Sequence, residues 1–236
     1  MNAKTFCLDN YKTVFFDLFH TLTYPGIMQH ERYEWELFGL DEKEWFSHSM
    51  ATYERRGLGI TNTPEGVIRD ILLSARIEFS PEQLCLATEI RIKRFCACLL
   101  HIKHEVLSTV ETLAGMGIEL CLVSNADVID KMGWSSSPLS RHFRHTVFSC
   151  DVGFRKPDLE IYTIALEKMA AKADESLFVG DGGGDEFIGA KKMKMDTLMT
   201  TEFITDIWPG KIEEIKKSAD FVVSRLSEIL APGKSI

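Results

Sequence analysis

The sequence lacks the cysteine spacing of a disulfide-rich or zinc-binding protein. Its six cysteines stand at positions 7, 85, 96, 98, 121 and 150, with no C-x-x-C pair and no dense framework. Disulfide scaffolds and structural zinc sites both depend on such spacing. We therefore expect reduced thiols, most of them buried.

The chain also has no excess of positive charge and no long apolar run. Its 27 basic residues stand against 35 acidic ones, and the net charge of −8 works against general attraction to nucleic acid or anionic membrane. No stretch approaches the length needed to cross a bilayer, and the first seven residues form no apolar signal segment. We expect a cytoplasmic protein with a small-molecule partner and no nucleic-acid or membrane partner; no oligomeric state is predicted.

What the sequence does have is an alternation of strands and helices. The run from Thr13 to Phe16 is β-branched and aromatic and stops at Asp17, while residues 118–123 form the near-continuous apolar run of a buried parallel strand. Further predicted strands are 146–149, 177–179, 197–199 and 221–223, with helices between them such as 158–169. This alternation predicts an α/β fold, a three-layer, Rossmann-like doubly wound parallel sheet.

The pattern changes to helices alone between residues 25 and 104. Thr63-Pro64-Glu65 and Ser80-Pro81-Glu82-Gln83 mark helix N-termini, the second as a capping box. A stretch of this length is too long for a loop within a compact domain. We predict that residues 1–24 and 105–236 form the α/β core and that residues 25–104 form an inserted helical cap.

Polar residues follow several predicted strands, where ligands of open parallel sheets bind. A carboxylate at Asp17 can attack phosphorus or carbon and form an ester that water later hydrolyses. Asp181 and Asp185, separated by three glycines, can bring hard oxygen ligands toward Asp17, which suits Mg²⁺. The polar segments are Asp17-Leu18-Phe19-His20-Thr21, Ser124-Asn125, Phe154-Arg155-Lys156-Pro157-Asp158 and Gly180-Asp181-Gly182-Gly183-Gly184-Asp185.

In this order the four segments resemble the motifs of the haloacid dehalogenase superfamily. The insertion after the first motif resembles its helical-cap subclass, which contains haloacid dehalogenases and phosphoglycolate phosphatases. The resemblance implies a hydrolase with Asp17 as nucleophile, Lys156 and Ser124 as catalytic groups, and an anionic small molecule as substrate. It implies that Thr21, Ser124, Asn125 and Lys156 bind substrate, and that Mg²⁺ is held by Asp17, the main-chain carbonyl of Phe19, Asp181 and Asp185.

Phe19 departs from the pattern of the phosphatases that the chain resembles. They usually carry an aspartate there as general acid and base, and phenylalanine can neither donate nor accept a proton. Haloacid dehalogenases have an aromatic residue there, because a halide leaves without a proton, but they lack the paired metal-binding acids that this chain keeps. We favour Mg²⁺-dependent hydrolysis of a small phosphate monoester. The alternatives are metal-independent 2-haloacid dehalogenase-like hydrolysis and a weakly active or non-catalytic small-molecule-binding protein.

His20 stands where the family usually has glycine. A histidine titrates near neutrality and can act as acid or base, so it is a candidate to replace the missing aspartate. Neighbouring residues that leave a strand point to opposite sides, however, so we expect His20 to point away from Asp17.

Overall fold

The computed structural model describes residues 5–231, so the ends of the predicted core, residues 1–4 and 232–236, lie outside the described residues. Its sheet is parallel throughout, with the order β3-β2-β1-β4-β5-β6. Every strand predicted from the sequence is present to within two residues, and the α/β fold is confirmed. The strands are β1 (Thr13–Phe16), β2 (Glu119–Ser124), β3 (His145–Phe148), β4 (Ser176–Gly180), β5 (Asp196–Thr200) and β6 (Phe221–Val223).

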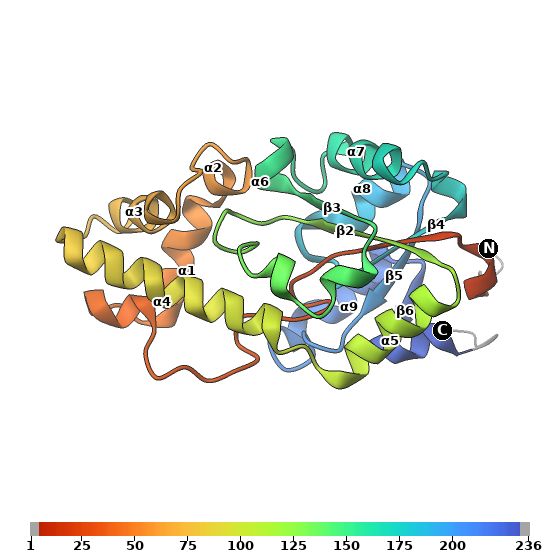
Figure 1. The fold of residues 1–236 in the computed structure, drawn as a ribbon, viewed down its shortest axis with the longest axis horizontal. Helices are drawn as coiled ribbons and strands as arrows, with labels where there is room; N and C mark the ends of the chain where they lie inside the picture. The colour runs from red at the N-terminus through yellow and green to blue at the C-terminus, as the bar shows by residue number, and fades with distance from the viewer. Residues whose placement is uncertain (1–4, 232–236) are drawn as a thin grey trace.

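Helices cover both faces of the sheet and make three layers. Val14 and Phe16 of β1 face a cluster shared with α5 (His104–Gly115), whereas Phe15 faces the opposite cluster, shared with α7 (Leu159–Met169) and α8 (Glu186–Lys192). In Figure 1, α7 and α8 lie above the sheet and α5 lies below it. Because both faces are covered, strands such as β1 are apolar at consecutive positions. Two shorter helices, α6 (Ser149–Val152) and α9 (Ile212–Ile215), follow β3 and β5.

A helical insertion separates β1 from β2 in sequence. Its elements are a 3₁₀ helix at Glu34–Phe38, α1 (Glu42–Ala51), α2 (Tyr53–Gly57), α3 (Pro64–Ser74) and α4 (Pro81–Leu100). At the start of α4 the Ser80 hydroxyl accepts from the Gln83 amide at 3.2 Å and the Gln83 side chain accepts from the Ser80 amide at 2.9 Å. This confirms the predicted capping box. The insertion lies on the left of Figure 1, far from both chain ends; its predicted limits, residues 25 and 104, stay a prediction.

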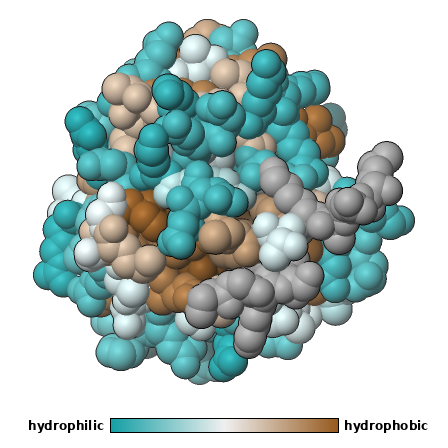
Figure 2. All heavy atoms as spheres, turned by 90° about the vertical axis from the view of Figure 1, so that its right-hand side faces the viewer, coloured by the Kyte–Doolittle hydropathy of each residue, from teal (hydrophilic) through white to brown (hydrophobic). Residues whose placement is uncertain are grey.

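The end of the molecule opposite the cap is largely hydrophilic, with a few apolar side chains gathered near its centre (Figure 2). All six cysteines carry free thiols, as expected, but only Cys98 and Cys121 are buried. Among the described residues, no helix combines the length and the apolar character needed to cross a membrane.

Candidate active site

Asp17 lies at the carboxyl end of β1, the strand between β2 and β4 at the middle of the sheet. Its amide still donates to the Val179 carbonyl of β4 at 2.9 Å, so the backbone of Asp17 is fixed by the hydrogen bonds of the sheet. The residue is 7% exposed, and the Thr21 hydroxyl donates to its Oδ2 at 3.1 Å. Asp17 is therefore held in one orientation at a nearly closed site.

Lys156 joins Asp17 to a second carboxylate. Its Nζ donates to Asp17 Oδ1 at 2.5 Å and to Glu186 Oε2 at 2.6 Å, and the residue is buried. Burial alone would lower the pKa of Lys156, but the charges of Asp17 and Glu186 outweigh that effect and raise it. The ammonium therefore stays charged beside Asp17 Oδ1.

Ser124 and Asn125 are neighbours in sequence, but their side chains make different contacts at the site. The Asn125 side chain donates to the Lys156 carbonyl at 2.9 Å and accepts from the Lys156 amide at 2.8 Å, so it holds the main chain of the lysine. The Ser124 hydroxyl is buried at the end of β2 and has no hydrogen-bond partner among the described residues. A buried hydroxyl without a partner is costly, and this one is free to bond a ligand oxygen.

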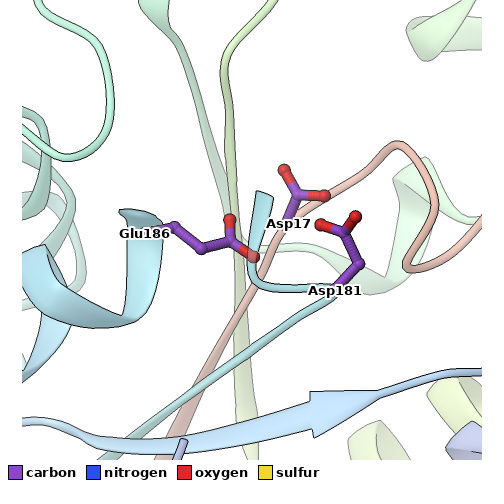
Figure 3. A group of neighbouring side chains, drawn as sticks. All are labelled: Asp17, Asp181 and Glu186. Atoms are coloured by element: carbon purple, nitrogen blue, oxygen red, sulfur yellow. The ribbon is translucent and has the colours of Figure 1, made fainter. Parts of the chain in front are cut away.

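Three carboxylates gather at the site, from Asp17, Asp181 and Glu186 (Figure 3). One oxygen of each lies within 4.8 Å of the others, and all three residues are buried. Burial, followed by the charge of Asp17, raises the pKa of Asp181 to about 7, and burial raises the pKa of Glu186 to about 8. The Lys156 ammonium can balance only one of the three carboxylates when all of them are ionised. This donor set fits a divalent cation with a preference for oxygen.

Asp185 lies outside this group, and the glycine-rich turn explains why. Gly184 and Asp185 both adopt left-handed backbone angles, φ +61° and +58°, which leave the Asp185 side chain exposed. The chain then enters α8, and Glu186 in its first turn points inward to accept from the Gly182 amide at 2.9 Å. The ligand role predicted for Asp185 stays a prediction, whereas Glu186 was missed by the sequence reasoning.

Gly180, the last residue of β4, makes room for Glu186. A Cβ at this position would lie 2.0 Å from the Glu186 carboxylate, closer than any side chain permits. The signal that could have identified Glu186 is its place in an apolar helix stripe with Phe187 and Ala190, all three of which are buried against the core. A glutamate on the apolar face of a helix is buried together with its apolar neighbours, and this burial marks it as a candidate site residue.

Phe19 and His20 both pack against aromatic rings. The Phe19 ring lies 5.7 Å from that of Phe95 in α4, so it joins the core to the cap. His20 has φ +66°, and its ring lies 4.6 Å from Trp208 and 6.0 Å from Tyr24. Burial lowers the pKa of His20, although the nearby charge of Asp17 acts in the opposite direction. His20 is therefore neutral and packed near pH 7.

The comparison with known proteins agrees with this geometry. A family profile described as haloacid dehalogenase-like hydrolase matches residues 11–192. A glyceraldehyde 3-phosphate phosphatase of Methanothermobacter thermautotrophicus is 26% identical over 195 residues, 80% of this chain and 79% of that protein. A bifunctional epoxide hydrolase 2 of Rattus norvegicus is 30% identical over 106 residues, 43% of this chain but only 19% of that protein.

Solved structures of both enzyme types share the fold. An L-2-haloacid dehalogenase from Xanthobacter autotrophicus superposes with a TM-score of 0.62 at 15% identity, covering 93% of this chain and 96% of that one. A HAD phosphatase from Thermococcus onnurineus superposes with a TM-score of 0.63 at 19% identity, covering 95% of this chain and 100% of that one. The fold alone therefore does not separate the two activities.

Proposed function

Because the chain belongs to the haloacid dehalogenase-like hydrolases, we propose that it hydrolyses a small phosphate monoester with Mg²⁺ and with Asp17 as nucleophile. The observation that carries this proposal is the group of three buried carboxylates around a single ammonium. Carbon-centre displacement of a halide needs no such excess of negative charge. The glyceraldehyde 3-phosphate phosphatases among the relatives support the same substrate class.

In the proposed reaction an oxygen of Asp17 attacks phosphorus, and the bond from phosphorus to the leaving oxygen breaks. Lys156 offsets negative charge on the nucleophile and on the phosphoryl group, and the free Ser124 hydroxyl donates to a phosphoryl oxygen. Water then attacks the aspartyl phosphate, which releases phosphate and restores Asp17. Thr21 holds Asp17 in its attacking orientation.

Asp17 and Asp181 are the residues proposed to hold the Mg²⁺. The Phe19 carbonyl and Asp185, directly or through water, are proposed to complete the set. Bound Mg²⁺ would neutralise the phosphoryl group and the excess charge of the carboxylates. Both oxygens of Glu186 accept from the protein, one from Lys156 and one from the Gly182 amide. We therefore assign Glu186 mainly to positioning Lys156.

An activity panel tests the proposal. Aryl, acyl and alkyl phosphates and 2-haloacids are each incubated with the protein in Mg²⁺ and in EDTA, and phosphate or halide release is measured. We expect phosphate release from the acyl and aryl compounds, and its loss in EDTA. Halide release that is unaffected by EDTA would instead establish the dehalogenase alternative, which Phe19 favours. No release from any compound, together with no Mg²⁺ binding, would leave a non-catalytic protein.

Without a general acid at position 19, phosphate esters with acidic leaving groups should be hydrolysed faster than alkyl phosphates. The Phe19→Asp variant tests this explanation. An aryl or acyl phosphate expels a stable anion, but an alkoxide needs a proton that Phe19 cannot donate. We expect Phe19→Asp to raise kcat for alkyl phosphates by about 10²-fold or more, with a smaller gain for aryl phosphates. Phe19→Asn is the matched control, because it loses the same ring contact with Phe95 but cannot transfer a proton. Equal gains for both variants, or for both substrates, would contradict this role of position 19.

A further inference from the structure

The turn that follows β2 is inserted into the cap. Residues 127–130 come directly after the site residues Ser124 and Asn125 and a single alanine. Ile129 in this turn is fully buried and belongs to the apolar cluster of the cap, together with Trp35, Ile68 and Phe95 among others. A segment of the core that carries site residues is thus packed inside the other domain.

Asp127 organises this turn through its own carboxylate. Its Oδ1 accepts from the amides of Ile129 at 2.9 Å and Asp130 at 3.1 Å. The Asp130 carboxylate accepts in return from the Asp127 amide at 3.0 Å. Asp127 is fully buried, so the conformation of the turn depends on a charged group that has no access to water.

Two arginines of the cap supply the opposite charge. Arg56 of α2, also fully buried, donates to Asp127 Oδ2, and Arg91 of α4 reaches the same oxygen at 3.5 Å and Asp130 Oδ1 at 3.1 Å. Arg56 is fixed in turn by the cap, because its Nη2 donates to the Ser49 carbonyl at 2.6 Å. A buried charge that loses its partner is strongly unfavourable. The observed turn is therefore stable only while the cap arginines are in place.

The other end of the turn leads to the nucleophile. Asn125, two residues before Asp127, is bonded to the amide and the carbonyl of Lys156. The Lys156 ammonium in turn bonds to Asp17. Polar contacts, joined by the short main-chain segment from Asp127 to Asn125, therefore lead from Arg56 in the cap to the Asp17 carboxylate.

We propose that Asp127 is a positioning residue through which the closed cap holds Lys156 in its place at the active site. Closure brings Arg56 and Arg91 onto Asp127, Asp127 fixes the turn, and the turn holds Asn125 on Lys156. Opening for substrate access removes the arginines and releases this support, so Lys156 is placed for catalysis only when the cap is closed. The catalytic consequence rests on the proposed function, whereas the link from Arg56 to Lys156 does not.

Hydrogen exchange at the Lys156 amide tests the link without any substrate. This amide donates to the Asn125 side chain. Its protection from exchange therefore measures whether the turn keeps Asn125 in place. In Arg56→Met we expect it to exchange about tenfold faster or more, with kcat about 10- to 100-fold lower because Lys156 is misplaced. Arg55→Met removes the neighbouring arginine of the same helix, whose side chain is 62% exposed, and should change neither quantity.

The double variant Arg56→Met/Asp127→Asn separates positioning from stability. It leaves no unpaired buried charge between these positions, and asparagine can still accept from the amides of Ile129 and Asp130. We expect the double variant to be more stable in urea than Arg56→Met. The Lys156 amide should still exchange faster than in the wild type, and kcat should stay low. It also carries the test if Arg56→Met fails to fold.

Two results would overturn the positioning role. One is Lys156 protection that does not change in Arg56→Met; the other is protection and kcat that recover with stability in the double variant. If the wild-type protein hydrolyses nothing, the proposed function fails, and the exchange rates alone decide whether the cap is linked to Lys156.

Discussion

Replacement of Asp17 with asparagine is expected to abolish hydrolysis, with a loss in kcat of about 10⁴-fold or more. The amide is a poor nucleophile, and the change removes one of the two carboxylates that hold the Lys156 ammonium. Steady-state release of phosphate measures the loss. Asp9→Asn, a change of the same type at an exposed residue of the core, is the control and should leave kcat unchanged. Residual activity near the wild-type level would mean that another group is the nucleophile.

Isotope labelling at Asp17 distinguishes the two hydrolytic reactions. An aspartyl phosphate is hydrolysed by attack of water on phosphorus, so turnover in H₂¹⁸O labels the released phosphate. An aspartyl ester of a carbon substrate is hydrolysed by attack on the carbonyl carbon, so the label enters the Asp17 side chain. Mass spectrometry of the peptide that contains Asp17 should therefore show no label after turnover of an aryl phosphate. Label in that peptide would favour the carbon-centred alternative.

The Asp181→Asn variant is expected to lose Mg²⁺ binding and to be more stable than the wild type without metal. At pH 8 in EDTA we expect its free energy of unfolding to be higher by about 1–2 kcal/mol, because a site built for function stores unfavourable charge. Saturating Mg²⁺ at about 100 times its Kd should add about 2.7 kcal/mol to the wild type and nothing to the variant. Urea unfolding and calorimetric titration measure the two effects. Asp174→Asn, an exposed change, is the control, and Asp185→Asn shows whether that exposed carboxylate also contributes to binding.

The stability difference should depend on pH in a defined direction. The pKa of Asp181 is raised from 3.8 to about 7 in the folded protein, so between these values the folded state keeps a proton that the unfolded state has released. The contribution of this group to stability is therefore full at low pH and is lost as the pH rises through about 7. The wild type and Asp181→Asn should converge below about pH 4, diverge as the pH rises from 3.8 to about 7, and keep a constant difference above that. Mg²⁺ affinity should rise by roughly tenfold per pH unit below about pH 7, where binding displaces one proton from Asp181, and should level off above it. A stability difference independent of pH would contradict the assignment.

The fold was predictable because its strands are buried on both faces. Residues 14–16 are apolar at consecutive positions and residues 118–123 nearly so, a pattern that central strands under two helical layers share. The start of α4 was equally readable, since Ser80 and Gln83 form a local capping box. Both features are formed by residues that are close in sequence, so a sequence pattern is enough to predict them.

The site was predictable only in part, because some of its geometry depends on backbone angles and distant contacts. The position of Asp17 follows from the end of β1, whereas Lys156 lies in the loop after α6 and reaches Asp17 from there. Glu186 rather than Asp185 is buried at the site because of two consecutive left-handed residues, which spacing does not reveal. The pairing of Arg56 with Asp127 spans 71 residues and joins the helical insertion to the segment after β2. A sequence pattern carries no signal for such a pair.

The central place of β1 has a consequence for synthesis. β1 leaves the ribosome before the other strands of this sheet, but its partner β4 begins only at Ser176, roughly 160 residues later, or about 8–30 s at usual elongation rates. The cap is complete well before then, and its helices can fold from local contacts. During that interval Thr13–Phe16 is an apolar strand without β4 beside it, which invites pairing with other chains. A chain that stalls in the cap thus exposes β1 and Asp17 without the rest of the sheet, and β1 is the segment that we expect a chaperone to cover.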